Sequence, residues 1–185
     1  MLDKDNFKKI QKELQEFEEK REEVIQLSRQ IITLSKRIIY GLQRNDVDKK
    51  LIAEIKLLIK KLPKETYDTG MQSVAVQEYV EAVCFYEMLI NNKVPTDKDL
   101  GIDVYEYLLG LCDLTGELVR KAVQCVIKKE YGQALKIKDL VEDIYGEFLK
   151  LDLRNGELRK KADSIKWNLK KLEDVAYDLK IKGMA

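Results

Sequence analysis

The fold is decided by residues 5–44, which read DNFKKIQKELQEFEEKREEVIQLSRQIITLSKRIIYGLQR. Apolar side chains recur in this stretch every three or four residues, as they do along one face of an amphipathic helix. They are Phe7, Ile10, Leu14, Phe17, Val24, Leu27, Ile31, Leu34, Ile38 and Leu42. A helix of about 40 residues is ~60 Å long, which exceeds the diameter of a compact domain. We therefore expect a partner subunit to cover part of it.

The remainder of the 185-residue chain has the same helical character. Charged residues make up 36% and hydrophobic residues 45% of the sequence, with only nine glycines and two prolines, a composition typical of amphipathic helices. Further helices are expected at about residues 47–61, 65–91, 103–130, 135–151 and 157–181. No linker rich in Gly, Ser or Pro divides the chain. The sequence therefore predicts an all-α fold, a single-domain bundle of six to seven helices over residues 1–185 with a long N-terminal helix.

The composition excludes several classes of function. The chain has no histidine, which removes Ser-His-Asp and Cys-His nucleophiles and histidine-ligated zinc. The 34 basic and 33 acidic residues balance, so any polyanion site has to come from a local excess of charge. Cys84, Cys112 and Cys125 lie in apolar helical stretches, as reduced core cysteines do. With neither a signal peptide nor an apolar run of ~18 residues, we expect a soluble cytoplasmic protein that does not enter a membrane.

Two helical stretches place acidic residues among apolar ones. In QEYVEAV, Glu78 and Glu81 fall on one helix face, and in YLLGLCDLTGEL, Asp113 and Glu117 do the same. A buried carboxylate has to be protonated, paired with a basic side chain or bound to a metal. Four carboxylates from two facing helices repel one another unless divalent cations bind them, and all-oxygen ligation suits Mg²⁺ or Mn²⁺. The reaction that such a site supports best without histidine is metal-dependent hydrolysis of a phosphodiester.

A simpler interpretation of these acids is structural. Glu78 or Asp113 could form an ion pair with a basic residue of the first helix, such as Arg29 or Arg37, and so fix the helix register. Ion pairs of this kind are commoner than metal sites, and spacing alone leaves both interpretations open.

The first helix also has an uneven distribution of charge. Four basic residues and no acidic residue lie between residues 24 and 44, namely Arg29, Lys36, Arg37 and Arg44. One interpretation is an RNA-binding strip that holds phosphates near the acids, with Tyr40 as a stacking surface. The other is a solvated or salt-bridged helix face. In the last helix, Trp167 is expected in the core or in a subunit contact.

Several of these stretches carry motifs of a known family. QEYVEAV at 77–83, YLLG at 107–110 and DLTGEL at 113–118 resemble the translin-associated factor X (Trax) branch of the translin family. LSR at 27–29 and SKR at 35–37 agree as well, whereas the C-terminal segment is closer to translin itself. The resemblance covers nearly the whole chain, which is similar to a self-assembling member of the prokaryotic or archaeal type.

The resemblance implies a function as well as a fold. Family members are all-α subunits of seven helices that form a closed, shell-like oligomer with RNA on its interior surface, and here a homo-oligomer, an octamer, is expected. In Trax the matching acids form a Mg²⁺-dependent endoribonuclease site, which carries over to Glu78, Glu81 and Asp113 as metal-binding and catalytic residues. Glu117 matches a fourth acid of that site. The chain lacks the long insertion and the basic N-terminal tail of Trax, and neither departure touches the site.

Three functions are therefore considered. The leading hypothesis is a Mg²⁺- or Mn²⁺-dependent endoribonuclease that acts on single-stranded RNA. The alternative is a non-catalytic, translin-like protein that binds single-stranded RNA or DNA and whose acids are structural. The third is a helical scaffold without affinity for nucleic acid. Metal-dependent cleavage distinguishes the first from the second, and salt-dependent binding distinguishes both from the third.

Overall fold

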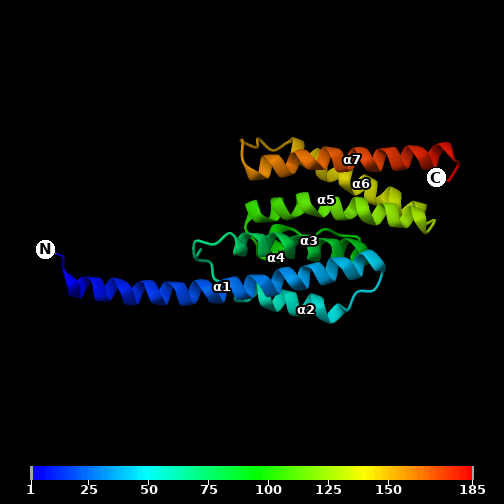
Figure 1. The fold of residues 1–185 in the computed structure, drawn as a ribbon. Coiled ribbons are helices and arrows are strands. Elements are labelled where there is room, and N and C mark those ends of the chain that lie inside the picture. Colours follow the sequence, from blue (N-terminus) through cyan, green and yellow to red (C-terminus); the bar gives the residue numbers. More distant parts are fainter. Residues whose placement is uncertain (1, 185) are drawn as a thin grey trace.

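The computed structural model describes residues 2–184, which form helices joined by short loops (Figure 1). The helices are α1 (Lys4–Arg44), α2 (Lys49–Leu58) with a 3₁₀ turn (Ile59–Lys61), α3 (Met71–Asn91), α4 (Asp97–Leu100), α5 (Val104–Ile127), α6 (Tyr131–Leu149) and α7 (Glu157–Ile181). No strand occurs between residues 2 and 184. The predicted all-α bundle with a long N-terminal helix is confirmed.

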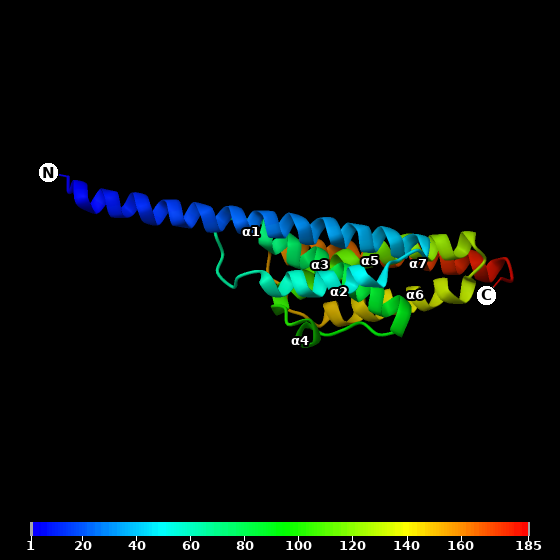
Figure 2. The same ribbon diagram turned by 90° about the horizontal axis from the view of Figure 1, so that it is seen from below.

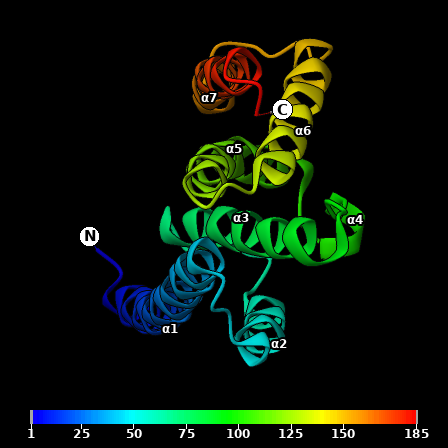
Figure 3. The ribbon, with the colours of Figure 1, turned by 90° about the vertical axis from the view of Figure 1, so that its right-hand side faces the viewer.

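Helices α3 and α5 lie in the middle of the bundle (Figures 1 and 3). On one side α3 packs against α1, which also contacts α2, and on the other side α5 packs against α6 and α7. Phe85 of α3 and Leu109 and Leu114 of α5 are completely buried between these layers. All three cysteines are buried and free, as predicted. The two stretches that carry the candidate acids are therefore the two central helices.

A glycine sets the distance between the central helices. A Cβ atom on Gly110 would lie 2.6 Å from Cβ of Val80 and 2.9 Å from the backbone oxygen of Gln77, closer than side-chain atoms can approach. The backbones of α3 and α5 therefore meet at this position because residue 110 has no side chain. Gly110 lies one helical turn before Asp113 and holds that turn against the turn of α3 that precedes Glu81.

The C-terminal end of α1 is attached to α5 by a buried lysine. Lys121 donates hydrogen bonds to the Leu42 carbonyl oxygen and to Oδ1 of Asn45, both at 2.6 Å. Asn45 ends the helix in the left-handed conformation, at φ 60°. Burial lowers the pKa of Lys121. These contacts fix the last turn of α1 relative to the central helices.

Three predicted boundaries differ from the structure. The helix expected from residue 65 begins only at Met71, because Asp68 adopts a left-handed conformation and the hydroxyl of Thr69 accepts the backbone N–H of Met71. The expected loop at 92–101 contains the short helix α4, which a capping box between Thr96 and Asp99 stabilises. Helix α6 begins at Tyr131 rather than at residue 135.

The first half of α1 extends beyond the rest of the molecule (Figures 1 and 2). Four apolar side chains of this half, here called the N-terminal stripe, are exposed, namely Phe7, Ile10, Leu14 and Phe17. The ring of Phe17 packs against that of Tyr67 in a tilted arrangement, with ring centroids 5.6 Å apart. The apolar face predicted for residues 7–42 is thus buried only from Val24 onward. Within residues 2–184, no helix has the length and hydrophobicity needed to cross a lipid bilayer.

Candidate carboxylate site between the central helices

The acids of α3 occupy its inner face. Glu81 lies within a continuous buried run from Tyr79 to Phe85, and only 9% of its surface is exposed. Glu78, one turn earlier, is half-buried. Among residues 2–184 no side chain donates a hydrogen bond to the Glu81 carboxylate or forms an ion pair with it. Glu81 is therefore a buried acid whose charge no neighbouring group neutralises directly.

The other predicted acids act on Glu81. Burial, together with the charges of Asp113, Glu78 and Glu117, raises the pKa of Glu81 to about 8, while Lys161 acts in the opposite direction. Burial likewise raises the pKa of Glu78, an effect that Lys36 partly offsets and Asp113 reinforces. Glu78 of α3 and Asp113 and Glu117 of α5 thus lie near enough to Glu81 for their charges to act on it, and their role as one metal site stays a prediction.

Basic side chains already neutralise three of the four acids. Lys36 lies 3.6 Å from Glu78, and Arg120 lies 3.6 Å from Glu117. Lys161, from α7, lies 2.6 Å from Oδ2 of Asp113. The ion-pair interpretation is therefore correct for Glu78 and Asp113. The proposed partners Arg29 and Arg37 are wrong, because Lys36 lies closer to α3 and because Lys161 reaches the site from a helix distant in sequence.

Two buried glutamines also belong to the site. Gln43 of α1 is 1% exposed, and its Nε2 donates to the backbone oxygen of Glu117 at 2.9 Å and to Oε2 of Glu117 at 2.7 Å. Gln77 of α3 accepts a hydrogen bond from Lys161 at 2.9 Å. Both follow the apolar periodicity of their helices, so their polarity at a buried position is the sequence signal that would have revealed them.

The basic residues predicted for RNA binding do not form one surface. Lys36 is 66% exposed and pairs with Glu78. Arg29 and Arg37 line a shallow groove between α1 and α2. Arg44 lies over the Tyr40 ring, 5.0 Å from its centroid, and donates a hydrogen bond to its hydroxyl. All four side chains are solvent-exposed, but they lie at three separate places. Lys36 lies at the acids, Arg29 and Arg37 lie in the groove, and Arg44 lies on Tyr40.

The donor atoms of the cluster suit a hard divalent cation, but they are not arranged as a finished metal site. Among residues 2–184, no three acidic or thiol side chains converge closely enough to hold a metal ion as they stand. The carboxylates of Glu78 and Asp113 bind ammonium groups instead. The all-carboxylate set and the unpaired, buried Glu81 fit Mg²⁺ or Mn²⁺, provided that side chains turn toward the ion.

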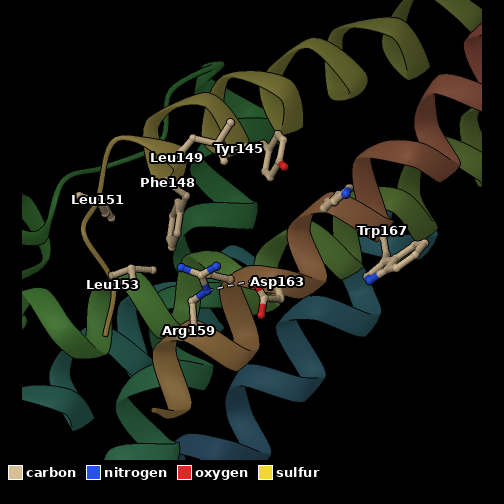
Figure 4. Close-up of a pocket in the computed structure, with 10 residues that line it drawn as sticks. Tyr145, Phe148, Leu149, Leu151, Leu153, Arg159, Asp163 and Trp167 are labelled. Atoms are coloured by element: carbon tan, nitrogen blue, oxygen red, sulfur yellow. Dashed lines mark ion pairs between the residues drawn. The ribbon is translucent and has the colours of Figure 1, made fainter. Parts of the chain in front are cut away.

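Another hollow, of about 480 Å³, lies between the end of α6 and the start of α7 (Figure 4). Phe148 and Tyr145 line it together with an ion pair between Arg159 and Asp163, whose atoms lie 3.3 Å apart. Trp167, which also lines the hollow, is 61% exposed. Trp167 is therefore not a core residue, and its role in a subunit contact stays a prediction. None of the four clustered acids reaches this hollow.

Comparison with protein families and known proteins agrees with the fold and the motifs. A family model described as the translin family matches residues 19–183. Translin of Homo sapiens is 28% identical over 184 residues, which cover 85% of this chain and 81% of that protein. Translin-associated protein X of Pongo abelii is 30% identical over 226 residues, covering 96% of this chain and 78% of that protein. Translin of Gallus gallus is 37% identical over 93 residues, or 49% of this chain and 41% of that protein.

Solved structures share the same architecture. The crystal structure of apo-NeC3PO has a TM-score of 0.85 and 32% sequence identity, and the match covers 94% of this chain and 96% of that chain. A structure of AfC3PO in complex with duplex RNA also has a TM-score of 0.85, at 22% identity, and covers 96% of this chain and 97% of that chain. At that identity the second match shows a common fold.

Because the pKa of Glu81 is raised, we expect the free energy of unfolding to depend on pH through this carboxyl group. Between pH 5 and 8 the unfolded chain has lost this proton while the folded protein retains it, so the stability of the wild type falls as the pH rises toward 8. The variant Glu81→Gln cannot ionise. In EDTA we expect nearly equal melting temperatures at pH 5 and a variant more stable by roughly 10 °C at pH 8.

The measurement is thermal unfolding followed by circular dichroism across that pH range. Glu173→Gln, at an exposed position of α7, is the matched control and should follow the wild type. A difference between Glu81→Gln and wild type that stays constant from pH 5 to 8 would show that Glu81 is ionised throughout.

Proposed function

The chain belongs to the translin family, and from this premise we propose that it is a cytoplasmic, metal-dependent endoribonuclease that acts on single-stranded RNA. The observation that carries the proposal is Glu81, a buried acid with no hydrogen-bond or ion-pair partner in residues 2–184, on which the charges of three further carboxylates act. Such an arrangement lowers stability, and residues that lower stability are expected where function requires them. The motifs that resemble Trax supply these same four acids.

The acids divide into two roles. Glu78, Glu81 and Asp113 would hold Mg²⁺ or Mn²⁺, which when bound supplies activation of water and neutralisation of charge on the phosphodiester. Glu117 is held by Gln43 and Arg120, so it completes or orients this set from the neighbouring turn of α5. The side chain of Glu81 is largely buried, and a partly desolvated carboxylate attracts a cation more strongly than a fully hydrated one.

Loss of a central acid should abolish cleavage without abolishing binding. For Glu81→Gln and Asp113→Asn we expect Mg²⁺-dependent cleavage of a labelled single-stranded RNA to fall roughly 100-fold or more, because each change removes a charged oxygen ligand. The control is Glu87→Gln, which removes a half-buried acid of α3 that pairs with Lys56 at 3.1 Å, away from the cluster. The same cleavage measurement is made with duplex RNA as a second substrate.

The alternative is a translin-like protein that binds single-stranded RNA or DNA without cleaving it. The ion pairs of Glu78 and Asp113 with lysines are the observation that favours it. Salt-dependent binding, with no metal-dependent turnover by the wild type, would establish this alternative in place of the nuclease. Cleavage that is equal in wild type and both central variants would remove the four acids from the reaction.

Arg29 and Arg37 are proposed to bind RNA phosphates, because they share a groove and no acid pairs with either of them in residues 2–184. For single-stranded RNA, the double variant Arg29→Ala, Arg37→Ala should flatten the slope of log K against log salt by about 1.4, the value for two phosphate contacts. Filter binding at several salt concentrations measures this slope. The control, Lys170→Ala with Lys171→Ala, removes two exposed charges from α7 on the opposite side of the bundle (Figure 1). Equal slopes for both double variants would place the RNA elsewhere.

We further propose that the chain assembles into a closed homo-oligomer, with an octamer as the expected size. The N-terminal stripe exposes four large apolar side chains, of which Phe17 alone contacts another aromatic ring within residues 2–184, and burial stabilises each such side chain by about 1.5–3 kcal/mol. A second copy of the chain carries the same stripe, so two copies can bury their stripes against each other.

Charge placed on the N-terminal stripe should weaken this assembly. The double variant Ile10→Asp, Leu14→Asp is expected to have a lower molar mass than the wild type by size-exclusion chromatography with light scattering. Gln11→Asp with Gln15→Asp adds the same charge beside the stripe and should keep the wild-type mass. The same mass for all three proteins would show that the stripe is not an interface.

A further inference from the structure

Lys161 is held at the carboxylate cluster more firmly than any other cation there. Its Nζ donates to Oδ2 of Asp113 at 2.6 Å and to Oε1 of Gln77 at 2.9 Å, and its side chain is 28% exposed. By contrast, Lys36 and Arg120 lie 3.6 Å from their acids with side chains 66% and 52% exposed. Two of the three N–H groups of the ammonium are thus used inside the protein.

The orientation of Gln77 is determined by its neighbours. Its Nε2 donates to Oγ of Ser73 and to Oε2 of Glu106, both at 2.9 Å, while its Oε1 accepts from Lys161. In the flipped orientation the amide oxygen would face the Glu106 carboxylate and the NH₂ group would face the ammonium, and both contacts would be repulsive. The hydrogen bonds that link Glu106, Gln77, Lys161 and Asp113 can therefore form in only one arrangement. In this arrangement the ammonium group of Lys161 lies beside the acids.

We propose that Lys161 is a built-in counter-cation of the carboxylate cluster, which holds Asp113 in the metal-free protein and competes with a divalent ion for it. This inference rests on the metal site of the proposed function. It accounts for two facts together, namely that four carboxylates come together in the folded protein and that they are not arranged around a metal position. A divalent ion has to displace the ammonium from Asp113 before this carboxylate becomes a ligand.

Removal of the competing charge should strengthen metal binding. For Lys161→Met we expect the Kd for Mn²⁺, measured by electron paramagnetic resonance of the free ion without RNA, to fall roughly tenfold. This is the effect of removing one unit charge about 5 Å from a divalent ion in a medium as polar as water. Lys161→Arg keeps the charge and should bind Mn²⁺ like the wild type. If Lys161 only positioned Asp113 for the metal, Lys161→Met would bind Mn²⁺ more weakly.

Thermal unfolding in EDTA provides a second readout that needs no metal. Lys161→Met should melt below the wild type, because the cluster loses its nearest positive charge, and Mn²⁺ should raise its melting temperature by more than it raises that of the wild type. Lys160→Met, which removes the exposed neighbouring lysine, is the control and should resemble the wild type in both measurements.

The outcomes separate the two proposals. If the wild type and Lys161→Met both bind Mn²⁺, and the variant binds equally or more weakly, the role of Lys161 is overturned while the metal site stands. Binding by neither protein overturns the metal site and the role of Lys161 with it. Tighter binding by Lys161→Met alone, with Lys161→Arg and Lys160→Met unchanged, supports the counter-cation.

Discussion

The contact of α3 with α5 at Gly110 is the constraint on which the rest of the structure depends. A side chain at residue 110 would collide with Val80 and with the backbone of Gln77, so the two central helices meet only because none is present. Close packing of Phe85, Leu109 and Leu114 keeps them together. This contact fixes the backbone turns of α3 and α5 from which Glu78, Glu81 and Asp113 extend. Their mutual repulsion is a consequence of backbone geometry, and the surrounding side chains have to compensate for it.

The compensating groups come from two flanking helices, and their contacts differ in strength. From α1, Lys36 approaches Glu78 loosely and Gln43 binds Glu117 in a buried position. From α7, Lys161 binds Asp113 at short range. Only Glu81 receives no direct partner within residues 2–184, and it is also the most deeply buried of the four acids. The electrostatic cost is thus largest at Glu81 and smaller at Glu78, whose pKa burial also raises.

Much of this could be predicted from the sequence, because helices reveal themselves by periodicity. The bounds of α7 and the pairing of acids on α3 and α5 follow directly from the spacing of apolar residues. The start of α3 was wrong because side-chain hydrogen bonds at Thr69 compete with the helix, a local effect that periodicity does not contain. Lys161 was missed because its partner lies 48 residues away, and the partner of Gln43, 74 residues away, could not be predicted even though a polar residue at an apolar position marks Gln43 itself.

Helix α1 connects the site with the exposed surface of the molecule. Its last turn is fixed by Lys121, Lys36 about two turns earlier extends toward the acids, and the first half presents the N-terminal stripe. No proline or glycine interrupts the helix before Gly41, so these parts keep a fixed relation along one rod (Figure 2). Any neighbour that packs on the N-terminal stripe therefore approaches in a direction set by the same helix that places Gln43 against Glu117. The N-terminal stripe and the carboxylate cluster thus share one rigid element.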